Sequence, residues 1–83
     1  MTITMYGADW CGDCVRAKKF FADNQVEHHW FDLEKDENEK FVGSEVLRRN
    51  NGKKSIPVIV FNDHSHLTEP TNAKLTEKLG LPL

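Results

Sequence analysis

Two cysteines, Cys11 and Cys14, are the residues whose types and spacing most clearly permit chemistry. In a Cys-x-x-Cys pair, one thiolate can attack a disulfide and the second thiol can release the mixed disulfide that results. An alternating segment ends at Gly7 and helical spacing begins at Gly12, so the pair is predicted at a strand-to-helix junction. There, unpaired N–H groups of the helix end favour a thiolate. We therefore predict that Cys11 is the nucleophile and Cys14 the resolving cysteine.

The residues around the cysteines modify this expectation. Asp13 suits a first helical turn, but a carboxylate near a thiolate opposes its ionisation, so we expect the Cys11 thiolate to be favoured only in part. The nearest compensating cations in the sequence are Arg16, Lys53 and Lys54. Gly12 is expected to allow a tight turn. Trp10 is expected either to shield the approach to the sulfur or to pack in the core.

A metal site is the alternative use of two neighbouring cysteines. Zinc sites combine such a pair with a second Cys-x-x-Cys or with spaced histidines, and neither follows at the needed spacing. His64 and His66 fall on a predicted hairpin and would complete a site only by chance of folding. For His28 and His29 we favour a strand with one ring inward and one outward. We therefore expect no metal and no bound cofactor.

The composition limits the classes of protein to consider. Eighty-three residues, 39% hydrophobic and 29% charged, fit one folded domain over residues 1–83. A net charge of −2 gives no reason to expect a nucleic-acid partner. The longest wholly apolar run, residues 58–61, is far shorter than the ~20 residues of a membrane span, and the N-terminus has no signal-peptide pattern. We expect a soluble, cytoplasmic monomer.

Three predicted elements position the cysteines. Alternating apolar and polar residues predict a first strand over residues 2–6. Cys14, Ala17 and Phe21 then recur at helical spacing, which predicts a helix from residue 12 to about residue 23 or 24. Aromatic and apolar side chains predict a second strand over residues 27–33, and the intervening helix allows it to run parallel to the first.

The second half of the chain predicts a helix, two strands and a last helix. A capping-box pattern and an irregular apolar face place the helix over residues 36–49. Strands are predicted over residues 58–61 and 66–68, the latter at the sheet edge. The last helix starts at residues 70–71 and stops at Gly80. The order βαβαββα predicts the α/β class with a thioredoxin-like fold, a four-stranded mixed sheet flanked by helices.

Ile56-Pro57 precedes a predicted strand and is a candidate cis peptide, because the cis form is cheap only before proline. In a fold of this order it would set a backbone edge beside Cys11. An extended thiol substrate could form main-chain hydrogen bonds there.

With these features in place, the chain resembles the glutaredoxin family over nearly its full length, and mycoredoxins most. The residues that carry the resemblance are Tyr6, Trp10 to Cys14, Phe41 to Ser44, Asn51-Gly52, Ile56 to Val58, Phe61 and Leu67 to Thr71. The resemblance implies a nucleophilic first cysteine, a cis-proline and a groove for a small thiol, which fall on Cys11, Pro57 and residues 68–71. Candidate substrate-binding residues are Trp10, Asp13, Ile56, Pro57, Thr68, Glu69 and Thr71.

Two departures from the family pattern bear on the choice of thiol. Glutathione-using members usually carry a Gly-Gly-Cys-like turn that holds a carboxylate, whereas this chain has Glu69 in that turn, and Asp13 replaces an aromatic residue of the dithiol. Both add negative charge, which favours the neutral thiol mycothiol over glutathione as co-substrate. Four basic residues nevertheless keep an anionic ligand such as glutathione possible: Arg48, Arg49, Lys53 and Lys54.

Three functions compete. The first is reduction of mixed disulfides between proteins and a low-molecular-weight thiol, with Cys11 attacking and either Cys14 or a second small thiol resolving the intermediate. The second is a thioredoxin-like electron donor, for example to ribonucleotide reductase, recharged by a flavoprotein disulfide reductase. The third is a metal or iron–sulfur binding module, which has the least support because only two sulfurs are present.

Overall fold

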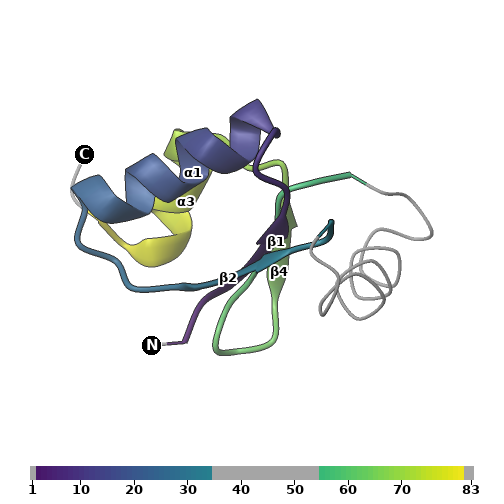
Figure 1. Ribbon diagram of the computed structural model, residues 1–83. Helices are drawn as coiled ribbons and strands as arrows, with labels where there is room; N and C mark the ends of the chain where they lie inside the picture. Colours follow the sequence, from purple (N-terminus) through teal and green to yellow (C-terminus); the bar gives the residue numbers. More distant parts are fainter. Residues whose placement is uncertain (1, 35–54, 82–83) are drawn as a thin grey trace.

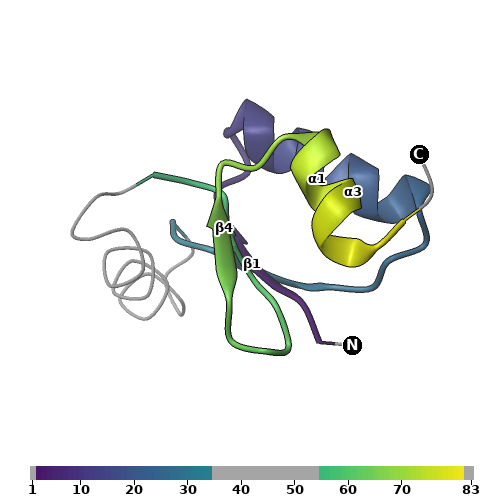
Figure 2. The ribbon, with the colours of Figure 1, turned by 180° about the vertical axis from the view of Figure 1, so that it is seen from behind.

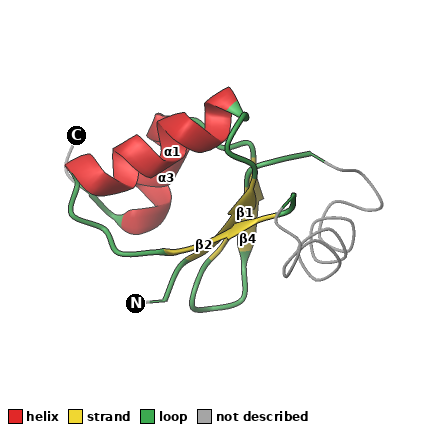
Figure 3. Ribbon diagram, in the orientation of Figure 1, coloured by secondary structure: helices red, strands yellow, loops and turns green. Residues whose placement is uncertain are grey.

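The computed structural model describes residues 2–34 and 55–81, so the helix predicted over residues 36–49 lies outside the described residues (Figure 1). The described elements follow the predicted order along the chain. Figure 3 distinguishes the helices from the strands. They are β1 (Thr4–Gly7), α1 (Gly12–Asp23), β2 (His29–Asp32), β3 (Val58–Val60), β4 (His66–Thr68) and α3 (Asn72–Leu79).

The four strands form one mixed sheet in the order β2-β1-β3-β4. The strands β1 and β2 are parallel, because α1 carries the chain back between them. β3 pairs antiparallel with both β1 and β4. The α/β class and the four-stranded mixed sheet of a thioredoxin-like fold are therefore confirmed.

Both described helices lie side by side on one face of the sheet, α1 nearer the viewer in Figure 1 and α3 nearer in the reverse view of Figure 2. Their apolar residues meet the sheet: Phe21 of α1 and Leu75 of α3 are fully buried, together with Met5 of β1 and Ile59 of β3. Cys14, Ala17 and Phe21 are the buried residues of α1, which is the helical spacing that the sequence indicates.

The helix ends follow from local capping chemistry. α1 begins after the N-cap Cys11, and α3 begins after the N-cap Thr71, whose hydroxyl accepts a hydrogen bond from the Lys74 amide at 3.1 Å. Gly80 ends α3 with a left-handed backbone, at a φ of 67°, which glycine adopts without a steric cost. Both helices therefore lie close to their predicted bounds.

β4 has its predicted bounds, whereas β1, β2 and β3 differ from prediction by one or two residues at their ends. β1 starts at Thr4 and includes Gly7, whereas the sequence predicts a strand that ends before Gly7. The reason is pairing: Thr4 faces His29 of β2, and Gly7 faces Asp32. Alternation of residue types cannot locate those limits, because they depend on the length of the neighbouring strand.

Within the described residues, no helix is long and apolar enough to cross a lipid bilayer.

Candidate active site

Cys11 caps the helix that carries both sulfurs. Its carbonyl accepts the first hydrogen bond of α1, from the Val15 amide at 3.0 Å, and its Sγ accepts a hydrogen bond from the Cys14 amide at 3.2 Å. The side chain is 7% exposed. An amide that donates to the sulfur and the positive end of the helix dipole both stabilise negative charge on that sulfur. The geometry thus suits Cys11 for the thiolate of a nucleophile.

Cys14 lies one helical turn further on, in a different environment. It is fully buried, and both cysteines are free thiols. Burial raises the pKa of the Cys14 thiol from its usual 9.0 to about 12, and the hydrogen bond with Cys11 and the charges of Cys11 and Asp13 act in the same direction. Cys14 is therefore a protonated thiol at neutral pH.

Gly7 provides the space that Cys14 occupies, a role that sequence reasoning missed. A Cβ atom at Gly7 would overlap the Cys14 Sγ and would lie 3.0 Å from the Trp30 ring. Gly12 shows the opposite: it has a helical backbone, and a Cβ atom there would meet open space. The turn expected at Gly12 therefore does not depend on glycine, because a residue with a side chain fits the same backbone.

The peptide bond between Ile56 and Pro57 is cis, as expected. Both residues are buried, and the Ile56 carbonyl oxygen lies 3.9 Å from the Cys11 Sγ. Although Cys11 and Ile56 are 45 residues apart in the chain, the fold thus places a backbone edge beside the first sulfur.

The turn between β4 and α3 lies against this proline. The amide of Glu69 donates to the Pro57 carbonyl at 2.8 Å, and Thr68, the last residue of β4, is half-buried. Glu69 has an exposed side chain and a left-handed backbone, with a φ of 49°. The Thr71 hydroxyl is used in capping α3. The candidates Pro57, Thr68 and Glu69 are therefore neighbours, whereas the Thr71 side chain serves the helix.

Trp10 lies at the surface next to Cys11. Its side chain is 69% exposed, so the alternative of core packing is wrong. The indole Nε1–H donates to the Glu34 carboxylate, at 2.6 Å from both oxygens. The carboxylate of Asp32 accepts hydrogen bonds from the amides of Asp9 and Glu34. Sequence reasoning missed Asp32 and Glu34, whose one local signal is the two-residue spacing of an Asx turn.

Asp13 points to solvent and pairs with a cation on its own helix. Its carboxylate lies 3.6 Å from the Arg16 guanidinium. Arg16 also donates to the Asn72 side chain at 2.6 Å and to the Pro70 carbonyl at 2.7 Å, so it ties α1 to the start of α3. Arg16 therefore offsets the charge of Asp13, while other basic residues weighed for this site, Arg48, Arg49, Lys53 and Lys54, lie outside the described residues.

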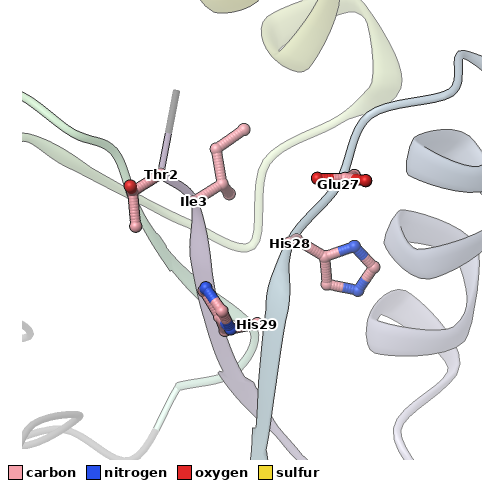
Figure 4. Close-up of a pocket in the computed structure, with 5 residues that line it drawn as sticks. All are labelled: Thr2, Ile3, Glu27, His28 and His29. Carbon is pink, nitrogen blue, oxygen red and sulfur yellow. The ribbon is translucent and has the colours of Figure 1, made fainter.

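A surface hollow of about 560 Å³ lies at the other end of the sheet, lined by Thr2, Ile3, Glu27, His28 and His29 (Figure 4). The His28 ring is turned toward α1, 4.9 Å from the Phe21 ring, and burial lowers its pKa. His29 is exposed, so one ring is inward and one outward, as favoured from the sequence. Across residues 2–34 and 55–81, no group of three or more His, Cys, Asp or Glu residues is placed to hold a metal ion.

Comparisons with known proteins agree with this geometry. The family model described as Glutaredoxin matches residues 3–66. The chain is similar to a glutaredoxin homologue from Mycobacterium tuberculosis, with 33% identity over 78 residues, 93% of this chain and 88% of the relative. It is also similar to mycoredoxin 1 of Corynebacterium glutamicum, with 31% identity over 77 residues, 93% of this chain and 91% of the relative.

A solved structure extends the likeness to the fold. Methanoredoxin of Methanosarcina acetivorans superposes with a TM-score of 0.84 at 26% sequence identity, covering 96% of this chain and 85% of that chain.

Proposed function

The chain belongs to the glutaredoxin family of thiol–disulfide oxidoreductases, and on that premise we propose that it reduces mixed disulfides between proteins and a low-molecular-weight thiol, with Cys11 as nucleophile. The observation that carries the proposal is the contrast between the two sulfurs. The Cys11 Sγ accepts an amide hydrogen bond at a helix N-terminus, and Cys14 is a buried thiol with a pKa of about 12.

In the proposed first step, the Cys11 thiolate attacks the sulfur of the small thiol in the mixed disulfide. One S–S bond breaks and another forms, the protein thiolate leaves and takes a proton from water, and Cys11 is joined to the small thiol. The Ile56 carbonyl, 3.9 Å from the Cys11 Sγ, marks the backbone edge along which the substrate would extend.

For the second step, we propose a second molecule of small thiol as the main resolving nucleophile. Formation of the mixed disulfide removes the charge on Cys11 and the hydrogen bond to it, which are two of the causes that raise the Cys14 pKa. Burial, the largest cause, and the charge of Asp13 remain. Cys14 therefore stays mostly protonated, and a solvent-borne thiolate has the advantage.

Single cysteine variants test whether Cys11 is the nucleophile and an external thiol resolves the intermediate. Cys11→Ser should lose turnover by several orders of magnitude, whereas Cys14→Ser should retain most of the kcat/KM for a protein–small thiol mixed disulfide, because an external thiol resolves the intermediate. Equal loss in both variants would refute the proposal and favour a dithiol electron donor. Direct reduction of the oxidised wild-type protein by thioredoxin reductase and NADPH, with no small thiol, would support the same alternative.

As co-substrate we propose mycothiol in preference to glutathione. Glu69 has an exposed side chain, and its amide donates a hydrogen bond to the carbonyl of Pro57, so the residue that carries this carboxylate lies beside the backbone edge at Cys11. Negative charge there opposes the carboxylate groups of glutathione but leaves a neutral thiol unaffected. The similarity to mycoredoxin 1 supports the same choice.

Glu69→Gln tests whether the negative charge of Glu69 disfavours glutathione, because it removes the charge and keeps the side-chain size. Glycine is a poorer test, because it would also free a backbone held at a φ of 49°. Loss of one unfavourable charge is worth on the order of 1 kcal/mol, so kcat/KM with a glutathionylated substrate should rise about fivefold relative to the mycothiolated one. Glu77→Gln, at an exposed position of α3, is the matched control. An unchanged ratio would overturn the charge argument.

A further inference from the structure

Asp32 is the one buried charged residue in the part of the chain that the structure describes, with 3% of its surface exposed. Its carboxylate accepts two backbone hydrogen bonds, one from the Asp9 amide at 3.0 Å and one from the Glu34 amide at 2.8 Å. A buried carboxylate needs such donors, because desolvation without them is costly. Asp32 therefore fastens the segment before Cys11 to the segment after β2.

The same two segments meet again at the surface. Glu34, whose backbone Asp32 holds, accepts the indole N–H of Trp10 on both carboxylate oxygens at 2.6 Å. The backbone is thus held at Asp9, immediately before Trp10, and the indole is held at the tip of its ring, yet Trp10 is 69% exposed. A large exposed indole that is held at both ends presents a rigid apolar surface beside Cys11.

We propose that Asp32 and Glu34 are positioning residues that hold Trp10 as a fixed wall of the substrate site, and that this wall selects mixed disulfides with an apolar residue next to the substrate cysteine. The inference rests on the proposed function and deepens it. A fixed indole should favour apolar substrates because of conformational entropy. A side chain that is already immobilised loses little freedom when a substrate contacts it, so its apolar surface contributes more to the free energy of binding.

Three variants distinguish an effect on the position of Trp10 from a general loss of folding stability. Asp32→Asn keeps the shape of the side chain but leaves one oxygen for two amide donors. Glu34→Ala removes the acceptor of the indole at an exposed position, and Glu34→Gln keeps one acceptor oxygen. The matched control is Asp63→Asn, because Asp63 also accepts a backbone amide two residues on, from Ser65 at 3.0 Å, in the turn between β3 and β4.

The first measurement concerns Trp10 itself. The protein contains two tryptophans, so fluorotryptophan labelling gives two fluorine NMR signals, which Trp10→Phe assigns. In Asp32→Asn and Glu34→Ala the Trp10 signal should shift toward that of free fluorotryptophan and sharpen, while the Trp30 signal stays in place. Glu34→Gln and Asp63→Asn should leave both signals near their wild-type positions. An unmoved Trp10 signal in both Asp32→Asn and Glu34→Ala would overturn the positioning role.

The second measurement concerns selectivity. Wild type is given two peptide mixed disulfides that differ only in leucine or glycine beside the cysteine. KM for the leucine peptide should be lower in wild type, and should rise about fivefold in Glu34→Ala, with kcat and the glycine peptide unchanged. Equal KM values in wild type, or a preserved preference in Glu34→Ala, would overturn the selectivity. If wild type reduces neither peptide, the proposed function and the selectivity fail together, while the fluorine signals still decide the positioning role.

Discussion

The two sulfurs of this chain differ in what surrounds each atom. Cys11 has an amide donor at 3.2 Å and a carbonyl edge at 3.9 Å, so it borders the place where a substrate would lie. Cys14 is enclosed, and Gly7 lies directly against its sulfur. A Cys-x-x-Cys motif is nearly symmetric as a sequence, and the asymmetry of its chemistry arises from these neighbours.

Gly7→Ala should therefore destabilise the protein, and Gly12→Ala is the matched control. At Gly7 the new methyl group overlaps the Cys14 sulfur beside the Trp30 ring, and overpacking of this kind costs about 1–3 kcal/mol. At Gly12 the same change meets open space on a helix, where alanine is favoured by up to ~1 kcal/mol. Urea unfolding of the reduced proteins measures both. Equal effects at the two positions would contradict the close packing of Gly7 on Cys14.

At the scale of elements, the sequence predicted the bounds of the two described helices better than the contacts between elements. Apolar spacing and the capping residues Thr71 and Gly80 are local, so the ends of α1 and α3 follow from neighbouring residues. The roles of Gly7 and Asp32 depend on contacts with other parts of the fold: Gly7 lies against Cys14 of α1 and Trp30 of β2, and Asp32 accepts a hydrogen bond from the Asp9 amide, 23 residues earlier. Residue types and spacing carry no record of such contacts, and hence these two roles could not be predicted.

Arg16 links α1, which carries both cysteines, to the turn that contains Glu69. Removal of its side chain should therefore destabilise the start of α3. Arg16→Ala loses the hydrogen bonds to Asn72 and the Pro70 carbonyl. Because the side chain is about one-third exposed, we expect a loss of about 1–2 kcal/mol rather than the sum for two buried charged bonds. Faster hydrogen exchange should be confined to the first turn of α3.

Lys19→Ala provides the control for this prediction on the same helix. Lys19 forms an exposed pair with Asp23 at 2.8 Å, and such a pair contributes only about 0.3–0.5 kcal/mol. If Lys19→Ala and Arg16→Ala destabilise the protein equally, or if exchange in α3 is unaltered in Arg16→Ala, Arg16 does not join the two helices.

In the whole molecule, the active-site end and the opposite end of the sheet are separated by the apolar core. The dithiol follows β1, whereas the hollow that contains His28 lies where β1 and β2 begin. Titratable groups with shifted pKa values occur at both ends, and their effects on folding have opposite pH dependence. For His28 the folded pKa is lowered, so its protonation below the ordinary value of 6.5 favours unfolding. For Cys14 the folded pKa is raised, so the loss lies on the alkaline side.

The raised pKa of Cys14 predicts how the free energy of unfolding changes at alkaline pH. Well below pH 9 the Cys14 thiol is protonated in both the folded and the unfolded state and contributes almost no pH dependence. Between pH 9 and about 12 the unfolded chain releases the proton and the folded chain keeps it, so stability falls as the pH rises. The limiting slope for one proton is about 1.4 kcal/mol per pH unit, which implies a loss of roughly 1 kcal/mol by pH 10.

Cys14→Ala isolates this contribution. The variant loses side-chain packing at every pH, so the quantity to compare is the change in unfolding free energy between pH 8 and pH 10, measured with urea under a reductant that acts at both pH values. Wild type should lose about 1 kcal/mol more than Cys14→Ala over this interval, because the other alkaline groups titrate in both proteins. Parallel pH dependence in the two proteins would show that the Cys14 pKa is not raised by folding. The argument that an external thiol outcompetes Cys14 would then lose its physical basis.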